Sequence, residues 1–212
     1  KINQNYNPDN FFLLKTRMNN YKINLNDFDT RDFNIVLIGD SHGQDLFNSL
    51  NLSRNFFSNI KFYYIGDLFS DKFDDKSNNE KFLKQANAII LSSRWDDYKI
   101  KALKDSFGKI KDLNQKIFIT SRTNEYKVFS KLYTLLDYEV LFNKDKNIDY
   151  FGLKKLYFKS RVISSNSTIN QKLKKFASEN SLIFLNKEDY MCDIPYKECD
   201  YVDKVGNKIF YD

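Results

Sequence analysis

A short apolar run that stops at a glycine constrains the fold of this chain more than any other stretch. Residues 35–38 read Ile-Val-Leu-Ile, and the polar tetrapeptide Gly-Asp-Ser-His follows at 39–42. An apolar run of this length bounded by glycine is typical of a buried strand in a parallel sheet. The next segment, 44–52, has helical character. A strand that enters a helix through a tight turn places that turn at the carboxyl edge of the sheet, where open α/β sheets bind their ligands.

Ser41 is the candidate nucleophile at this turn. A sharp strand-to-helix turn exposes the serine hydroxyl, and the first N–H groups of the helix lie close enough to stabilise a developing oxyanion. The alternative is that Asp40 and Ser41 only cap the start of a helix, which is a common use of these residue types.

Alternating strand and helix patterns predict the rest of the fold. Short apolar runs separated by helical segments of ten or more residues favour crossover connections and a parallel sheet. We expect a flavodoxin-like, three-layer α/β/α fold with about five strands in the order 2-1-3-4-5. The predicted strands are 34–38, 61–65, 88–91, 116–120 and 182–185, and the predicted helices are 80–86, 96–113, 125–136, 147–161 and 167–179. Residues 1–32 are interpreted as a lead-in, and the segment after 185 as loop-like.

The basic balance of the chain does not indicate a nucleic-acid partner. The formal net charge is +6 in 212 residues. Lysines are scattered rather than gathered in a dense stripe with interleaved aromatics, and arginine is scarce. The surplus weakly favours acidic glycans or anionic lipid headgroups. No apolar run among the given residues approaches the length of a membrane span, and we expect no secretory signal among them.

A second group of polar residues follows the third predicted strand. Ser93, Arg94 and Trp95 should face the Ser41 turn, because the first and third strands are neighbours in the expected order. Ser93 and Arg94 could donate hydrogen bonds to an acyl or sugar oxygen, and Trp95 could form a wall for a sugar ring or an acyl group. The alternative makes Trp95 a large core residue and Arg94 a surface ion-pair former.

Cys192 and Cys199 are the two cysteines of the chain. Their spacing favours a disulfide that closes a small loop, and hence an extracytoplasmic location. Two free thiols or half of a metal site are the alternatives. A zinc site is disfavoured because the chain has no second cysteine pair and its single histidine, His42, lies elsewhere. His42 is also poorly placed to act as a base for the adjacent Ser41.

These motifs together resemble the SGNH/GDSL hydrolase superfamily. The resemblance is to the SGNH domain found behind membrane acyltransferase family 3 domains, the O-acetyltransferases of surface polysaccharide and peptidoglycan. It spans about residues 34–212 and is carried by Gly-Asp-Ser-His at 39–42, by Ser93-Arg94-Trp95, and by the late order Cys192, Cys199, Gly206, Phe210, Tyr211 and Asp212.

The resemblance implies a Ser-His-Asp triad with Ser41 as nucleophile and Asp212 as the carboxylate that orients a histidine three positions further on. That histidine would lie beyond Asp212, so we expect residues 33–212 to be an SGNH-type catalytic domain cut at its C-terminal end, with a pseudoenzyme as the alternative. The superfamily's Gly-x-Asn-Asp block is absent. Gly66, Ser93 or Arg94 would then complete the oxyanion hole, and Asp40 and His42 would support the site.

The implied function is O-acyl transfer, most simply O-acetyl transfer, to a cell-surface glycan through an acyl-serine intermediate. A secreted carbohydrate esterase and a non-catalytic glycan-binding module are the alternatives. The expected partners are the glycan acceptor and a membrane acyltransferase domain that delivers the acyl group, with no metal or organic cofactor. The expected location is periplasmic or at the cell surface, tethered to a membrane. The sequence does not indicate the oligomeric state.

Overall fold

The computed structural model describes residues 31–52, 57, 59–66, 82–112, 116–122, 150–160 and 164–200. The chain divides into two compact units. The first is built from residues 22–122 and 167–186 and contains the central sheet; the second is built from residues 1–21, 123–166 and 187–212. The described residues include only 31 and 32 of the predicted lead-in, 1–32. The predicted helix 125–136 lies outside them, and so do Gly206 and Asp212.

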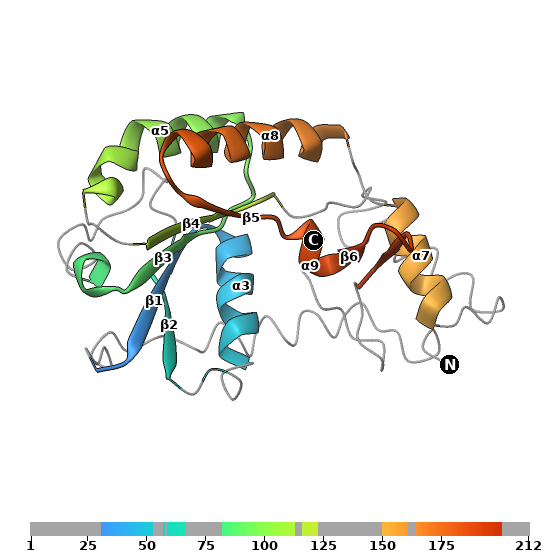
Figure 1. The fold of residues 1–212 in the computed structure, drawn as a ribbon, viewed down its shortest axis with the longest axis horizontal. Coiled ribbons are helices and arrows are strands. Elements are labelled where there is room, and N and C mark those ends of the chain that lie inside the picture. Colours follow the sequence, from blue (N-terminus) through green and yellow to red (C-terminus); the bar gives the residue numbers. More distant parts are fainter. Residues whose placement is uncertain are drawn as a thin grey trace. The chain divides into compact units, whose positions relative to one another are not determined.

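Five parallel strands form the sheet of the first unit, in the order β2-β1-β3-β4-β5 (Figure 1). Their bounds are β1 Phe33–Ile38, β2 Ile60–Tyr64, β3 Ala88–Leu91, β4 Lys116–Thr120 and β5 Ile183–Leu185. The predicted α/β class, strand number and strand order are therefore confirmed. Each observed strand agrees with its predicted range to within one residue at either end.

Helices cover both faces of this sheet (Figure 1). Helix α3, Ser41–Leu52, packs on one face, where Phe47 joins Leu37 and Ile90 in a small apolar cluster. Helices α5, Asp97–Lys111, and α8, Ser164–Glu179, cover the other face. The apolar positions of α5 recur at the helical spacing that the sequence predicts, and all are buried: Ile100, Leu103, Phe107 and Ile110.

The register of the sheet brings the ends of β1 and β3 side by side. Ile38, the last residue of β1, pairs with Leu91, the last residue of β3. The residues that follow the two strands therefore leave the same edge as neighbours, because parallel strands end on the same side of the sheet. This register places the Gly39–His42 turn next to the segment that begins at Ser92.

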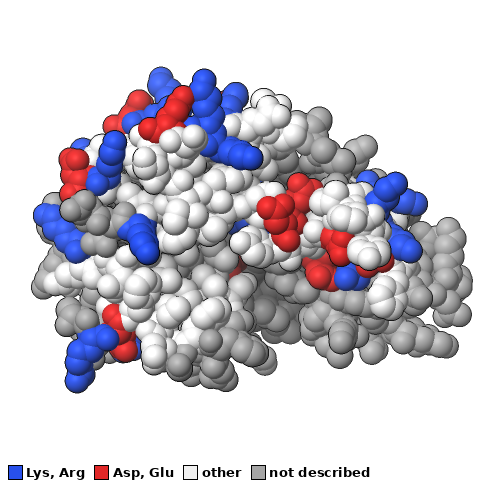
Figure 2. All heavy atoms as spheres, viewed as in Figure 1, with Lys and Arg blue, Asp and Glu red and all other residues white. Residues whose placement is uncertain are grey.

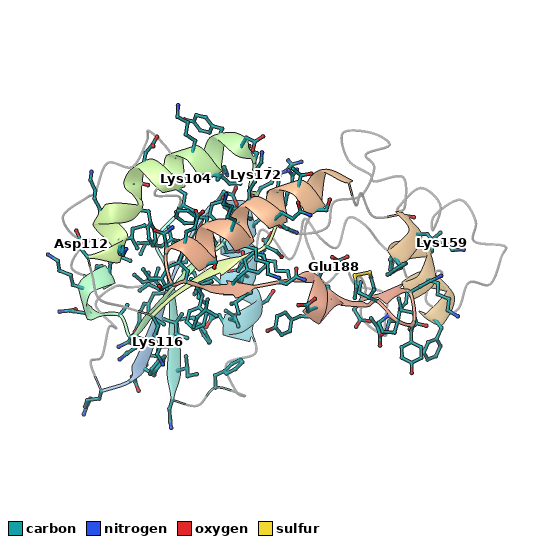
Figure 3. The ribbon with its side chains drawn as sticks, turned by 45° about the horizontal axis from the view of Figure 1, so that its top comes forward. Lys104, Asp112, Lys116, Lys159, Lys172 and Glu188 are labelled. Atoms are coloured by element: carbon teal, nitrogen blue, oxygen red, sulfur yellow. A yellow bond between two sulfur atoms is a disulfide. The ribbon has the colours of Figure 1, made fainter. Side chains whose placement is uncertain are left out.

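The second unit contains three short elements after β5 and one longer helix. They are α7 Tyr150–Ser160, α9 Glu188–Met191, and an antiparallel pair of two-residue strands, β6 Cys192–Asp193 and β7 Glu198–Cys199. The expectation of a loop after residue 185 is thus corrected. Such short elements have no apolar periodicity from which they could be predicted. Figure 3 shows the disulfide between Cys192 and Cys199, which confirms the predicted pairing.

Ion pairs join the hairpin to α7 within this second unit. The Lys154 ammonium lies 3.0 Å from a carboxylate oxygen of Asp200 and 3.7 Å from one of Glu198. Among the described residues, no helix combines the length and the apolar character needed to cross a bilayer.

Candidate active site

The turn between β1 and α3 presents Ser41 as the first residue of the helix. Asp40 caps this helix: its side-chain oxygen accepts from the His42 N–H at 2.9 Å, and its carbonyl accepts from the Gln44 N–H at 3.0 Å. The helix begins three residues earlier than predicted because this cap orders the first turn. Ser41 is exposed. Asp40 thus occupies the N–H groups of His42 and Gln44. Because the N–H groups of a first helical turn have no carbonyl partner within the helix, those of Ser41 and Gly43 are the donors that an oxyanion next to Ser41 would meet.

Two glycines let the turn approach the chain that follows β3. A Cβ atom on Gly39 would lie 1.6 Å from the carbonyl oxygen of Ser92, and one on Gly43 would lie 2.6 Å from the same oxygen. Gly39 also donates its N–H to the carbonyl of Gly66 at 3.0 Å, and Ser92 donates to Ile38 at 2.9 Å. The turn is held on both sides, by the chain after β2 and by the chain after β3.

Tyr64, the last residue of β2, also stabilises the turn through hydrogen bonds. Its hydroxyl oxygen lies 2.8 Å from the carbonyl of Gly39 and 3.1 Å from that of Asp40, and it donates to these acceptors. Its ring stacks on Phe47 of α3, with centroids 6.0 Å apart. Sequence reasoning missed Tyr64. Its position at the carboxyl end of the strand beside β1 was the available signal.

The Asp40 carboxylate links the turn to the segment after β3. It accepts the Arg94 N–H at 3.0 and 3.1 Å and the ammonium group of Lys99, which lies in the first turn of α5. The same ammonium lies 3.1 Å from the Ser93 hydroxyl oxygen. Burial acts to raise the pKa of Asp40, but hydrogen bonds from Lys99, Arg94 and Ser93 and the positive charge of Lys99 outweigh it and hold that pKa below the usual value.

Lys99 is the second residue of this site that sequence reasoning missed. A lysine in the first turn of a helix is unfavourable next to the positive end of the helix dipole. Its backbone N–H is held at 2.8 Å by the side chain of Asp96, which caps α5. The available signal was a lysine at a helix position that disfavours positive charge, close to the edge of the sheet at which Asp40 follows the neighbouring strand.

The structure corrects the expectation for Trp95 and places Ser93 and Arg94. Trp95 has 0% of its surface exposed and belongs to the main hydrophobic core, so its ring offers no wall to a substrate. The alternative of a large core residue is the one that its burial supports. Ser93 is also fully buried, and its hydroxyl is hydrogen-bonded within the Asp40–Lys99 cluster. Arg94 is exposed beside Asp40 and donates its backbone N–H to that carboxylate.

Of the remaining predicted site residues, His42 and Gly66 are described by the structure and Asp212 is not. His42 is buried at the start of α3. Gly66 has a φ of +82°, in the region that favours glycine, and its carbonyl binds the turn. Its N–H as an oxyanion donor stays a prediction. Asp212 lies outside the described residues, so its place beside Ser41 also stays a prediction.

Buried hydroxyl groups fix the neighbouring part of the strand edge. The Thr120 hydroxyl, at the end of β4, donates to the Ser92 hydroxyl oxygen at 3.1 Å, and both side chains are almost fully buried. Ser121 donates its N–H to the carbonyl of Leu185 at 2.8 Å. Because buried polar groups that are hydrogen-bonded stabilise one arrangement of the chain, these contacts keep Ser92 in place against Gly39 and Gly43.

Comparison with one solved structure supports the fold. The periplasmic domain of the lipopolysaccharide acetyltransferase of Salmonella ser. Paratyphi A is similar with a TM-score of 0.63 and 15% identity, over 93% of this chain and 85% of that one. A GDSL-like lipase of Bacteroides thetaiotaomicron gives a TM-score of 0.45 and 10% identity, over 95% of this chain and 90% of that one. No curated protein sequence matches the chain significantly.

The family assignment comes from the sequence as a whole. The family model described as "SGNH domain (fused to AT3 domains)" matches residues 14–212. This match includes the Gly-Asp-Ser-His turn, the segment after β3 and the cysteine pair, which are the motifs that carry the resemblance. The chain therefore belongs to the family of SGNH domains that are fused to AT3 domains.

Proposed function

We propose that this domain transfers an acyl group, most simply acetyl, to a hydroxyl of a cell-surface glycan through an acyl-serine intermediate. The observation that carries the proposal is the exposed Ser41 at the first position of α3, on a turn fixed by Asp40, Tyr64 and Gly39. A nucleophile needs access to its substrate and a fixed position relative to the oxyanion donors, and this turn supplies both.

In the proposed reaction the Ser41 hydroxyl oxygen attacks the carbonyl carbon of an acyl donor. The histidine that the resemblance implies beyond Asp212 accepts the hydroxyl proton and passes it to the leaving oxygen, and Asp212 orients that histidine. The tetrahedral oxyanion is stabilised by N–H groups of the first turn of α3. A glycan hydroxyl then attacks the acyl-serine, gives its proton to the histidine, and leaves as the ester while Ser41 recovers its proton.

The proposed partners follow from the family. A domain fused to an AT3 acyltransferase domain would receive its acyl group from that membrane partner. The similar Salmonella domain is a periplasmic domain of a lipopolysaccharide acetyltransferase, and this supports our choice of a glycan acceptor and an extracytoplasmic location. The Cys192–Cys199 disulfide is consistent with an oxidising compartment. Arg94, exposed beside the turn, is our candidate for orienting the acyl or sugar oxygens.

The test measures how acyl groups divide between acceptor and water. The full-length protein is supplied with an acetyl donor and increasing concentrations of an acceptor glycan, and acetylated glycan and free acetate are both quantified. A transferase forms acetylated glycan at the expense of acetate as acceptor rises. If acetate dominates even at saturating acceptor, the domain is an esterase. If neither product forms while glycan is still bound, the domain is a binding module.

Two serine variants show whether the reaction depends on Ser41. Ser41→Ala removes the proposed nucleophile from an exposed position and should abolish both products while the fold is retained. Ser49→Ala is the matched control, because Ser49 is exposed on the same helix, two turns further along. Activity that survives Ser41→Ala would remove Ser41 from the role of nucleophile, and equal losses in both variants would indicate damage to α3.

A further inference from the structure

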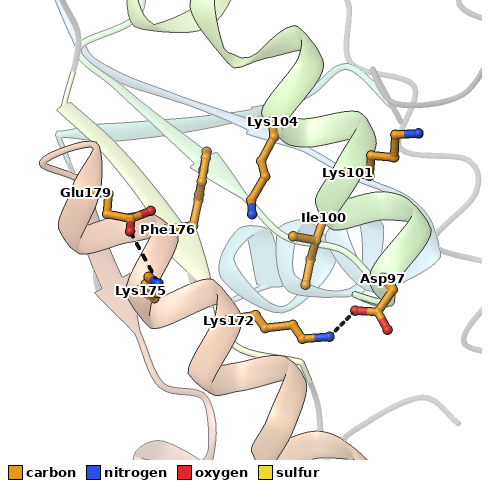
Figure 4. A pocket seen from close by; sticks show the side chains of 8 residues that line it. All are labelled: Asp97, Ile100, Lys101, Lys104, Lys172, Lys175, Phe176 and Glu179. Atoms are coloured by element: carbon orange, nitrogen blue, oxygen red, sulfur yellow. Dashed lines mark hydrogen bonds and ion pairs between the residues drawn. The ribbon is translucent and has the colours of Figure 1, made fainter.

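A groove runs between α5 and α8 on the outer face of the first unit (Figure 4). Its volume is about 590 Å³, and its lining contains four lysines, two from each helix: Lys101, Lys104, Lys172 and Lys175. Ile100 and Phe176 form an apolar floor and are almost fully buried. Lys104 points into the groove and Lys101 points outward at its rim (Figure 4). Figure 2 shows Lys and Arg side chains over these two helices, with Asp and Glu side chains among them.

The carboxylates of the groove are already used by two of its lysines. A carboxylate oxygen of Asp97 lies 2.6 Å from the ammonium nitrogen of Lys172. A carboxylate oxygen of Glu179 lies 3.8 Å from the ammonium nitrogen of Lys175. Lys101 and Lys104 have no ion-pair or hydrogen-bond partner in the described part of the chain. Both are exposed and lie three residues apart on α5, Lys104 directed into the groove and Lys101 outward at its rim (Figure 4). Each ammonium group would therefore gain free energy from an anion that approaches this surface.

The character of the groove indicates which anion it would hold. Lysine ammonium groups on flexible stems are strongly hydrated point charges, which suit phosphate groups whose positions vary. The groove offers no exposed aromatic ring on which a sugar or a base could stack, because Phe176 is 5% exposed. Exposed lysines Lys109, Lys111 and Lys174 lie outside the groove, and the exposed carboxylates Asp105 and Asp112 lie in the same stretch as the first two.

We propose that the α5–α8 groove docks the domain on anionic phospholipid headgroups, with Lys101 and Lys104 as the principal contacts. This inference rests on the proposed function in one respect: fusion to a membrane acyltransferase domain keeps the SGNH domain beside a bilayer. Clustered lysines gain binding free energy from each contact with an anionic membrane surface, and the attraction is lost when salt screens it. Docking through the α5–α8 groove would hold the domain close to the membrane domain that supplies the acyl group.

The experiment measures co-sedimentation of the chain with lipid vesicles. Vesicles of phosphatidylcholine alone are compared with vesicles that contain about 30% phosphatidylglycerol, because the attraction needs anionic headgroups. We expect binding only to the anionic vesicles at about 0.1 M salt, and its loss at about 0.5 M. Inorganic phosphate added as a competitor tests whether free phosphate occupies the groove equally well. Binding to neutral vesicles, or binding that is insensitive to salt, would contradict an electrostatic docking site.

Charge-reversal variants separate the groove from net charge. Lys101→Glu with Lys104→Glu should reduce the partition coefficient on anionic vesicles about tenfold or more. Lys109→Glu with Lys111→Glu, on the same helix outside the groove, is the matched control and should change it about twofold or less. Each double variant lowers the net charge by four, from +6 to +2. Equal losses in the two variants would show attraction by net charge alone and would overturn the proposed site.

Failure of docking can be distinguished from failure of the proposed function. Ser41→Ala should bind anionic vesicles as the unaltered chain does, because Ser41 does not line the groove and the substitution leaves the net charge unchanged. The groove variant should still hydrolyse or transfer acetyl from a soluble donor in the full-length protein. Retained circular dichroism and an unchanged midpoint of thermal unfolding exclude misfolding as the reason for lost vesicle binding.

Discussion

The ammonium group of Lys99 binds the carboxylate of Asp40, so the first turn of α5 is tied to the residue that caps α3. Both side chains are largely buried, at 20% and 18% exposed. The Arg94 N–H reaches the same carboxylate. One ion pair therefore fixes the turn that carries Ser41 relative to the segment that carries Arg94, although 59 residues separate the two partners in sequence.

Replacing Lys99 should affect both stability and turnover. In Lys99→Met the Asp40 carboxylate keeps its burial but loses its cation, so the free energy of unfolding should fall by about 3 kcal/mol. In the full-length protein, kcat should fall more than KM rises, because the change displaces the Ser41 turn rather than removing a substrate contact. Urea denaturation and steady-state kinetics are the measurements.

Two further substitutions control the Lys99 experiment. Lys99→Arg should restore part of kcat, because it restores the positive charge. Lys101→Met, on the same helix and without a partner among the described residues, should change the free energy of unfolding by about 0.5 kcal/mol or less. A Lys99→Met variant that is destabilised but turns over normally would show that the ion pair has no positioning role in the reaction.

The lowered pKa of Asp40 predicts a loss of stability in acid. Its folded-state pKa lies below the ordinary value of 3.8, so its contribution is present above that value and is lost as pH falls through the folded pKa. Between about pH 5 and pH 3 the free energy of unfolding should therefore fall more steeply in the unaltered chain than in Asp40→Asn. The difference between the two proteins, followed by denaturation across this range, should shrink. A difference that is constant with pH would contradict the assignment.

The glycines of the turn should not tolerate a side chain. Gly39→Ala places a Cβ 1.6 Å from the Ser92 carbonyl oxygen, and we expect this variant not to reach the native fold. Gly43→Ala, with a Cβ at 2.6 Å from the same oxygen, should lose about 1–3 kcal/mol through overpacking.

Gly108 provides the matched control for these substitutions. It lies within α5, and a Cβ there meets no atom within 4 Å. Gly108→Ala should stabilise the protein by about 0.5–1 kcal/mol, because alanine favours the helix. Chemical denaturation of the three variants gives the comparison. A Gly43→Ala variant as stable as Gly108→Ala would show that the close contact with Ser92 is relieved at no cost.

The disulfide should stabilise the second unit locally. Closing so short a loop is worth about 2 kcal/mol through the unfolded chain. In the Cys192→Ser, Cys199→Ser double variant, amides of Glu188–Asp200 should therefore exchange with solvent faster, while those of β1 should not change. Hydrogen exchange measured by mass spectrometry resolves the two regions. Equal acceleration in β1 would mean that the hairpin and the central sheet unfold together.

The sheet was predictable because its signals are local. Runs such as Ile35–Ile38 and Ala88–Leu91 are short, apolar and bounded by polar residues, which identifies buried parallel strands without knowledge of their neighbours. The strand order followed from the crossover rules. The hairpin of β6 and β7 was not predictable, because its two-residue strands are held by a disulfide and by Lys154 rather than by a pattern along the chain.

The sequence by itself determined the turn that carries Ser41, since a glycine, a capping carboxylate and a serine between a strand and a helix leave few local conformations. Only the tertiary structure decided which side chains surround that turn. Lys99 and Tyr64 reach it from other elements, and Trp95, which follows the neighbouring strand, turns into the core instead. Pattern along a chain fixes the conformation of a segment, whereas the direction and burial of each side chain depend on packing between segments that are distant in sequence.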